Sequence, residues 1–168
     1  TFDLELIKSE LSRRATGGNL NSKRSESDDF EIKSGYFNGF TTGNPILISI
    51  KNEDVKSDDY HKDLIRPSHA DYPNYVKSGG YNDYRGGGSS SARLTTPLVI
   101  VGAICKQLLK EDGIEIGGNL NQVGGLKLAK FDNEKINKEL LNKLTNMEIP
   151  NLENKQELFT GIVNGTII

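Results

Sequence analysis

The stretch that decides the fold is TTPLVIVGAICKQLLK, residues 95–110, whose composition indicates a helix that is apolar on nearly every side. Thr96 is a candidate N-cap, Pro97 suits the first helical position, and Gly113 suits the position just after the last turn. A helix without a polar face is normally buried all round. We therefore predict a buried helix here, packed between two layers of the protein.

Outward from this helix, further segments show the periodicity of regular structure. Apolar residues at helical spacing predict helices over 2–14 and 135–144, and alternating or continuous apolar runs predict strands over 30–33, 45–50, 114–116 and 161–168. The segment 52–93 has little periodicity, and long irregular segments in compact chains are usually functional or disordered. We expect an α+β fold, in one domain over 1–168.

Composition excludes several classes of protein. The chain has 168 residues, a net charge of −2, two histidines and one cysteine, Cys105. This balance argues against a nucleic-acid-binding surface, and it leaves too few ligands for a common zinc site or an internal disulfide framework. No apolar run is long enough to span a membrane, and the first residues do not form a signal peptide. We therefore expect a cytoplasmic protein without a metal, nucleic-acid or membrane partner.

The first candidate site is the run from Arg85 to Arg93, RGGGSSSAR. Its glycines let the backbone approach a ligand, and its serines add hydroxyl donors. The run leads into the N-terminus of the apolar helix, whose N–H groups attract anions. The run is neither a Walker loop nor a dinucleotide fingerprint. A phosphate site and a flexible Gly/Ser linker both remain open from these residues alone.

The second candidate is His69, in the run RPSHAD over 66–71. Histidine suits proton transfer near neutral pH, Asp71 is near enough in sequence to orient it, and Arg66 could hold a phosphate. The plainer alternative is a turn histidine with a structural hydrogen bond. The third candidate is the pair Arg13 and Arg14 at the end of the first helix, which could clamp an anion or simply face solvent.

Taken in order, the motifs resemble those of the chorismate synthase family. The matching segments are Ser12-Arg13-Arg14 with Gly17, Glu31 to Gly35, Thr41 to Ile46, Asn52 to Tyr60, Arg66 to Asp71, and Asp83 to Arg93. The similarity is strong from Leu4 to Gln122 and loose beyond it, apart from 136–149. Several long motifs in one order are a far stronger signal than any single motif.

The resemblance implies a fold and an activity. The family fold is a β-α-β sandwich, with helices packed between antiparallel sheets, and its members assemble as homotetramers. They convert 5-enolpyruvylshikimate 3-phosphate to chorismate by a 1,4-elimination of phosphate, in the shikimate pathway of aromatic amino-acid biosynthesis. They require reduced FMN, which some members regenerate with NADPH, although the reaction has no net redox change.

The resemblance also implies roles for individual residues. His69 would be the general acid that protonates the leaving phosphate. Substrate or NADPH would bind at Arg13, Arg14 and Arg93, and FMN at Arg85, Ser89, Ser90 and Ser91.

Some positions depart from the family pattern. Ser68 stands where the family has glycine, Ser89 where it has a basic residue or histidine, and Leu94 where glutamate is common. The family's second catalytic histidine lies upstream of the sequence given, and part of its flavin site lies downstream. We therefore expect weak activity or none from these 168 residues by themselves. The alternatives are a non-catalytic remnant that binds an anion or flavin, and a structural assembly module.

Overall fold

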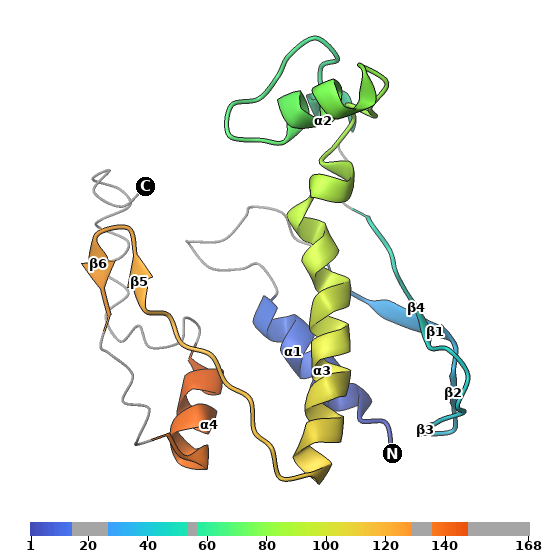
Figure 1. The fold of residues 1–168 in the computed structure, drawn as a ribbon. Helices are drawn as coiled ribbons and strands as arrows, with labels where there is room; N and C mark the ends of the chain where they lie inside the picture. The colour runs from blue at the N-terminus through green and yellow to red at the C-terminus, as the bar shows by residue number, and fades with distance from the viewer. Residues whose placement is uncertain (15–26, 54–56, 129–135, 148–168) are drawn as a thin grey trace. The chain divides into compact units, whose positions relative to one another are not determined.

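The computed structural model describes residues 1–14, 27–53, 57–128 and 136–147. The chain divides into two compact units, Thr1–Ile104 and Cys105–Ile168, which are described separately below. The described residues are mixed α+β, with helices and two-stranded antiparallel sheets (Figure 1). This confirms the predicted class, whereas the layered sandwich and the single domain stay predictions.

The core of the first unit joins helix α1 (Leu4–Arg14) to helix α3 (Thr95–Glu111). Its buried members are Phe2, Ile7, Leu11, Ile100 and Ala103. Figure 1 shows α1 and α3 crossing, with strands β1 and β4 beside them. Helix α1 confirms the prediction for 2–14, and its N-terminus is capped by Asp3, whose Oδ1 accepts from the N–H groups of Glu5 and Leu6.

The predicted strands at 30–33 and 45–50 are confirmed, and they pair with each other. Strand β1 (Phe30–Ser34) runs antiparallel to β4 (Leu47–Ile50), with Ile32 opposite Ile48. Ile32, Ile48 and Ile50 pack against the helical core, whereas Leu47 lies exposed, as the alternation of a half-buried strand requires.

A short hairpin between these strands did not appear in the sequence analysis. Strand β2 (Tyr36–Phe37) pairs with β3 (Phe40–Thr41) through a turn at Asn38 and Gly39, both with positive φ. Turns of this kind match the twist of the strands they join. The hairpin is tied to the core because the Phe2 N–H donates to the Gly39 carbonyl and the Phe2 ring lies 5.5 Å from that of Tyr36.

Helix α3 confirms the helix predicted over 95–110, but the candidate N-cap is wrong. It begins at Thr95, directly after the short 3-10 turn η3 (Ala92–Leu94), and Ser91 caps that turn by accepting from the Arg93 N–H. Thr96 is therefore not the N-cap. Its hydroxyl is fully buried and has no hydrogen-bond partner among the described residues.

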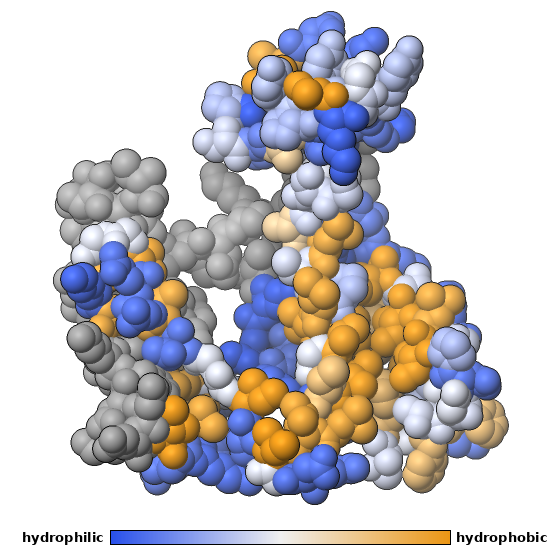
Figure 2. Space-filling view, viewed as in Figure 1, coloured by the Kyte–Doolittle hydropathy of each residue, from blue (hydrophilic) through white to orange (hydrophobic). Residues whose placement is uncertain are grey.

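The expected burial of α3 on all sides is also wrong. Only Thr96, Ile100 and Ala103 are buried, whereas Leu98 is 69% and Val101 56% exposed. Figure 2 shows apolar side chains along this helix on the viewer's side. The stretch Ala92–Glu111 is long and apolar enough to cross a membrane, by length and composition alone. Core helices of soluble proteins meet the same criterion, so the expectation of no membrane partner stays a prediction.

The segment 52–93 contains helix α2 (Asp71–Ser78) and the 3-10 turns η1 (Ser57–Asp59) and η2 (Gly88–Ser90). Helix α2 ends at Gly79, which takes a left-handed conformation and donates its N–H to the carbonyls of Tyr75 and Val76. Apart from the start of η3, the rest of the described part of this segment forms neither helix nor strand.

In the second unit, α3 ends at Glu111, and Gly113 follows its last turn as predicted, with a φ of 74°. The predicted strand at 114–116 is wrong, because the residues that pair are β5 (Gln122–Val123) and β6 (Leu126–Lys127). Helix α4 (Lys138–Asn146) confirms the described part of the prediction over 135–144, with Leu144 buried and Asn137 as its N-cap. The strand predicted over 161–168 and Gly17-Gly18 lie outside the described residues.

Candidate functional site

Two of the candidate arginines meet at one buried carboxylate. Asp28, only 4% exposed, accepts from Arg14 Nη1 through Oδ2 at 2.7 Å and from Arg93 Nη1 through Oδ1. Arg14 Nε also donates to Thr95 Oγ1 at 3.2 Å, and Arg93 Nη2 donates to the Lys51 carbonyl at 2.9 Å. Asp28 by itself balances one of the two positive charges. The structure therefore brings together two cations that the sequence separates widely.

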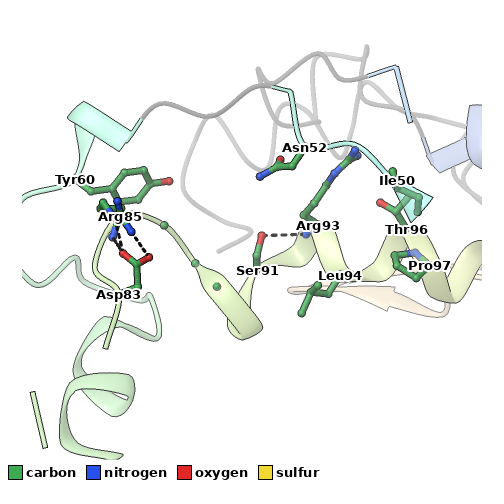
Figure 3. A pocket seen from close by; sticks show the side chains of 13 residues that line it. Ile50, Asn52, Tyr60, Asp83, Arg85, Ser91, Arg93, Leu94, Thr96 and Pro97 are labelled. Atoms are coloured by element: carbon green, nitrogen blue, oxygen red, sulfur yellow. Dashed lines mark hydrogen bonds and ion pairs between the residues drawn. The ribbon is translucent and has the colours of Figure 1, made fainter. Parts of the chain in front are cut away.

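A cavity of about 410 Å³ opens beside Arg93. Its lining is Ile50, Asn52, Tyr60, Asp83, Arg85, Gly86, Gly87, Gly88, Ser91, Arg93, Leu94, Thr96 and Pro97 (Figure 3). This volume is in the range of small-molecule sites, ~300–1,000 Å³. Three of the candidate residues, Arg85, Ser91 and Arg93, thus share one cavity wall with the glycine run.

The serines of the glycine–serine run have different positions. Ser91 is half-buried and lines the cavity, where its hydroxyl accepts from the Arg93 N–H. Ser89 and Ser90 are exposed, and Ser90 contacts Asn74 at 3.3 Å rather than the cavity. The N–H groups of Ser90, Ser91 and Leu94 bond to carbonyls three residues earlier. Their use in 3-10 turns removes these three amides as anion donors, and whether the first amides of α3 bind an anion stays a prediction.

Arg85 reaches the cavity with its charge already paired. Its guanidinium makes two hydrogen bonds to Asp83, through Nε and Nη2, both at 2.9 Å. Those hydrogen bonds lower the pKa of the Asp83 carboxyl to about 2. Both side chains are more than half exposed, so the pair can open to solvent or to a ligand.

His69 lies in an exposed turn before helix α2. Its Nδ1 is 2.9 Å from the Pro67 carbonyl oxygen, which can only accept, so Nδ1 carries a proton and Nε2 is the position for proton transfer. The expectation that Asp71 orients His69 is wrong, because Asp71 accepts from Arg66 Nε and Nη2 at 2.8 Å. These bonds lower the pKa of Asp71 to about 2.

A second cavity, of about 340 Å³, places this turn near the first cavity. Arg66 and Asp71 line it, and it shares Tyr60, Asp83 and Gly86 with the larger one. His69 itself lines neither cavity. The Arg66 guanidinium also stacks over the Tyr60 ring at 4.7 Å, which fixes Arg66 from a second side.

Arg13 lies apart from this cluster. It pairs with Glu10 on the same helix at 2.9 Å, as residues one helical turn apart often do. The structure thus separates the two neighbouring arginines of the sequence, since Arg14 faces Asp28 and Arg13 does not join it.

Sequence reasoning missed Asp28 and the buried hydroxyl of Thr96. Asp28 stands in a polar stretch without periodicity, and its partners are 14 and 65 residues away. Thr96 carried a signal, a threonine before a proline at a helix start, but that signal indicated a cap. No group of three or more potential metal ligands forms within the described residues.

The lining of the larger cavity suits part of a phosphate-bearing cofactor. Reduced FMN, which the resemblance implies, needs donors for its phosphate and room for the rest of the molecule. The unpartnered Thr96 hydroxyl and the Arg93 guanidinium are such donors in one wall. Ser91 and the glycine run would hold the cofactor from the neighbouring wall.

Comparison with known proteins identifies the family of the chain. The family model described as chorismate synthase matches residues 1–167. Chorismate synthases of Francisella tularensis subsp. novicida (strain U112) and subsp. tularensis (strain SCHU S4 / Schu 4) are each 51% identical over 134 residues. Each alignment covers 78% of this chain and 38% of the relative, so the chain spans well under half the length of these relatives. By its match over almost its whole length, the chain belongs to the chorismate synthase family.

Proposed function

We propose that this chain is a segment of a chorismate synthase, a carbon–oxygen lyase that eliminates phosphate from 5-enolpyruvylshikimate 3-phosphate. The observation that carries the proposal is the meeting of Arg14 and Arg93 at Asp28, beside a cavity of small-molecule size. Paired guanidinium groups recognise phosphate and carboxylate through charge-assisted hydrogen bonds. The proposed substrate carries both groups.

In this proposal, Arg14 and Arg93 bind and orient the anionic substrate. Arg93 lines the cavity directly, and Arg14 supports the same charge cluster from α1. Thr95 fixes Arg14 by accepting from Nε, and the Lys51 carbonyl fixes Arg93 by accepting from Nη2. Both arginines are therefore held before a ligand arrives, which reduces the entropy lost on binding.

His69 is the proposed general acid. The Pro67 carbonyl holds Nδ1–H, so a protonated ring presents Nε2–H to the departing phosphate oxygen. The chemistry that reduced FMN would supply when bound is transient electron donation to the substrate. Arg85 and Ser91 are the proposed FMN contacts in the larger cavity, and Ser89 and Ser90 are further proposed contacts on the adjoining turn η2. In some family members NADPH reduces the flavin.

Assembly is a second proposed role, because apolar surface remains exposed on α3. Leu98 and Val101 are more than half exposed on this helix. A homotetramer of the longer protein, located in the cytoplasm, would agree with the family resemblance. In that case these residues contribute to association even if the isolated chain binds a ligand without turnover.

The experiment is an anaerobic incubation of the 168-residue chain with reduced FMN and 5-enolpyruvylshikimate 3-phosphate, following chorismate and the flavin spectrum together. We expect a spectral change with slow turnover or none. Arg93→Lys is the informative variant, since it keeps the charge but loses the fork that contacts Asp28 and Lys51. No spectral change, no product and no substrate binding by the chain would contradict the proposed ligand site.

A further inference from the structure

A buried hydroxyl in the wall of the larger cavity lacks a hydrogen-bond partner. Thr96 has 0% exposure, and its Oγ1 is the one buried side-chain polar atom without a partner in the part of the chain that the structure describes. Buried polar groups in folded proteins are nearly always hydrogen-bonded, because an unmade bond costs free energy. An unpartnered hydroxyl at a cavity wall is therefore a position where a ligand atom can complete the bond.

The neighbouring threonine shows that a local partner is available at this point of the chain. Thr95 Oγ1 donates to the Ala92 carbonyl at 2.7 Å and accepts from Arg14 Nε. Thr96, one residue later, makes no such bond and is one of the residues that line the cavity. The residue after it, Pro97, has no N–H to offer a ligand, so the Thr96 hydroxyl is the polar group that this turn of α3 contributes to the cavity.

The charges around the cavity indicate the chemistry of the ligand atom. Arg93 lines the same wall less than one helical turn earlier, and Figure 3 shows its side chain and Thr96 together above the start of α3. The acidic residue of the lining, Asp83, is paired with Arg85. A hydroxyl donor beside a guanidinium favours an oxyanion over a cation or a neutral group.

We propose that Thr96 Oγ1 donates a hydrogen bond to a phosphate oxygen of the ligand that occupies this cavity, beside Arg93. The inference rests on the proposed function, because the proposed substrate and FMN both carry a phosphate. It assigns to Thr96 a direct ligand contact. It also predicts that the Thr96 hydroxyl lowers the stability of the ligand-free chain and is kept because it contributes to binding.

The test depends on two opposite expected effects of removing the Thr96 hydroxyl, higher stability of the free chain and weaker ligand binding. Thr96→Val has nearly the same shape but no hydroxyl, so it should raise the melting temperature by about 2–4 °C. The same change should weaken binding of the phosphate-bearing ligand about tenfold, measured by titration calorimetry. Thr96→Ser should restore the affinity to within about threefold of the original chain, because it restores the donor.

Two control variants separate this role from general effects of threonine replacement. Thr95→Val should lower the melting temperature, because its hydroxyl has partners on both sides. Thr41→Val, at an exposed position in β3 outside the cavity lining, should leave the affinity unchanged.

The titrations use 5-enolpyruvylshikimate 3-phosphate, FMN and inorganic phosphate with each variant of the 168-residue chain. The compound whose affinity falls in Thr96→Val identifies which phosphate the hydroxyl contacts. If the chain binds phosphate or FMN through Thr96 but not the shikimate compound, the proposed function fails and the inference stands. If the shikimate compound binds and none of the three compounds loses affinity in Thr96→Val, the inference fails and the proposed function stands. A Thr96→Val chain that is destabilised, or an original chain that binds none of the three, also overturns the inference.

Discussion

Replacement of Asp28 by asparagine tests the charge cluster that carries the proposed site. The Asp28 side chain is 4% exposed and accepts one hydrogen bond on each oxygen, from Arg14 and from Arg93. Asparagine offers a single oxygen acceptor, and its NH₂ group would face the second guanidinium. The substitution therefore leaves one cation without its partner in a site largely removed from water.

The expected loss of stability is large for a single isosteric change. Removal of one partner from a buried ion pair costs ~3–5 kcal/mol. The Arg14 and Arg93 side chains are 22% and 18% exposed, so water replaces part of the lost bond and the lower end, ~3 kcal/mol, applies. For a chain of this length that loss lowers the melting temperature by ~6–12 °C. Asp28 has a φ of 52°, which asparagine adopts readily, so backbone strain adds nothing.

The assay is urea unfolding followed by circular dichroism, with Asp29→Asn as the matched control. Asp29 is exposed and adjacent, so its replacement changes the net charge equally without touching the two arginines. We expect the control to stay within ~0.5 kcal/mol of the original chain. Equal free energies of unfolding for the two variants would refute the reasoning, since the loss would then come from charge alone or be absent.

Three further outcomes are expected. In thermal unfolding, Gly35→Ala should lower the free energy of unfolding by ~1–3 kcal/mol more than Gly43→Ala does. Both glycines have a φ of 81°, but only a Cβ at Gly35 would meet backbone atoms, at 2.7 Å. Equal losses would contradict the steric argument. Ser68→Gly should stabilise the chain by up to ~1 kcal/mol, because Ser68 has a φ of 61° and the strain relieved exceeds the entropy that glycine adds to the unfolded state; a destabilised variant would show that the serine side chain is needed. The pKa of Asp71 is lowered to about 2, so its ion pair with Arg66 should stabilise the fold fully at pH values above the ordinary carboxyl pKa of 3.8 and progressively less as the pH falls toward 2. The carboxyl carbon resonance of Asp71 should therefore titrate near pH 2. Titration near pH 4 would show that the ion pair is absent in solution.

Periodicity and capping signals identified most of the longer elements. The alternation at 45–50 predicted β4 correctly, and Gly113 marked the end of α3. The two short hairpins were missed because two-residue strands are too short to show alternation. At 114–116 an apolar alternation was present, but β-pairing occurs further along the chain, which local pattern cannot reveal.

The candidate site was predictable where it is local in sequence. The glycine run and Ser91 lie at the cavity that their composition suggested. The role of Asp28 was not predictable, because nothing near it in sequence marks a carboxylate that bridges α1 and η3. Thr96 was assigned to a cap because the 3-10 turn before α3, which is capped by Ser91 instead, leaves no trace in the pattern. The roles assigned to all of the candidate residues stay predictions.

The packing of α1 against α3 has a consequence for how the protein is made. Ile7 and Leu11 share their core with Ile100 and Ala103, so the core around the first helix stays incomplete until the third helix has been synthesised, although residues of β1, β2 and β4 reach it earlier. At ribosomal rates of ~5–20 residues per second, roughly 90 intervening residues correspond to ~5–20 s of exposure. During that interval the part of the α1 apolar face that α3 later covers is open to chaperones and to other nascent chains. The arginine pair can form only after this wait, which makes the ligand site one of the last parts of the first unit to assemble.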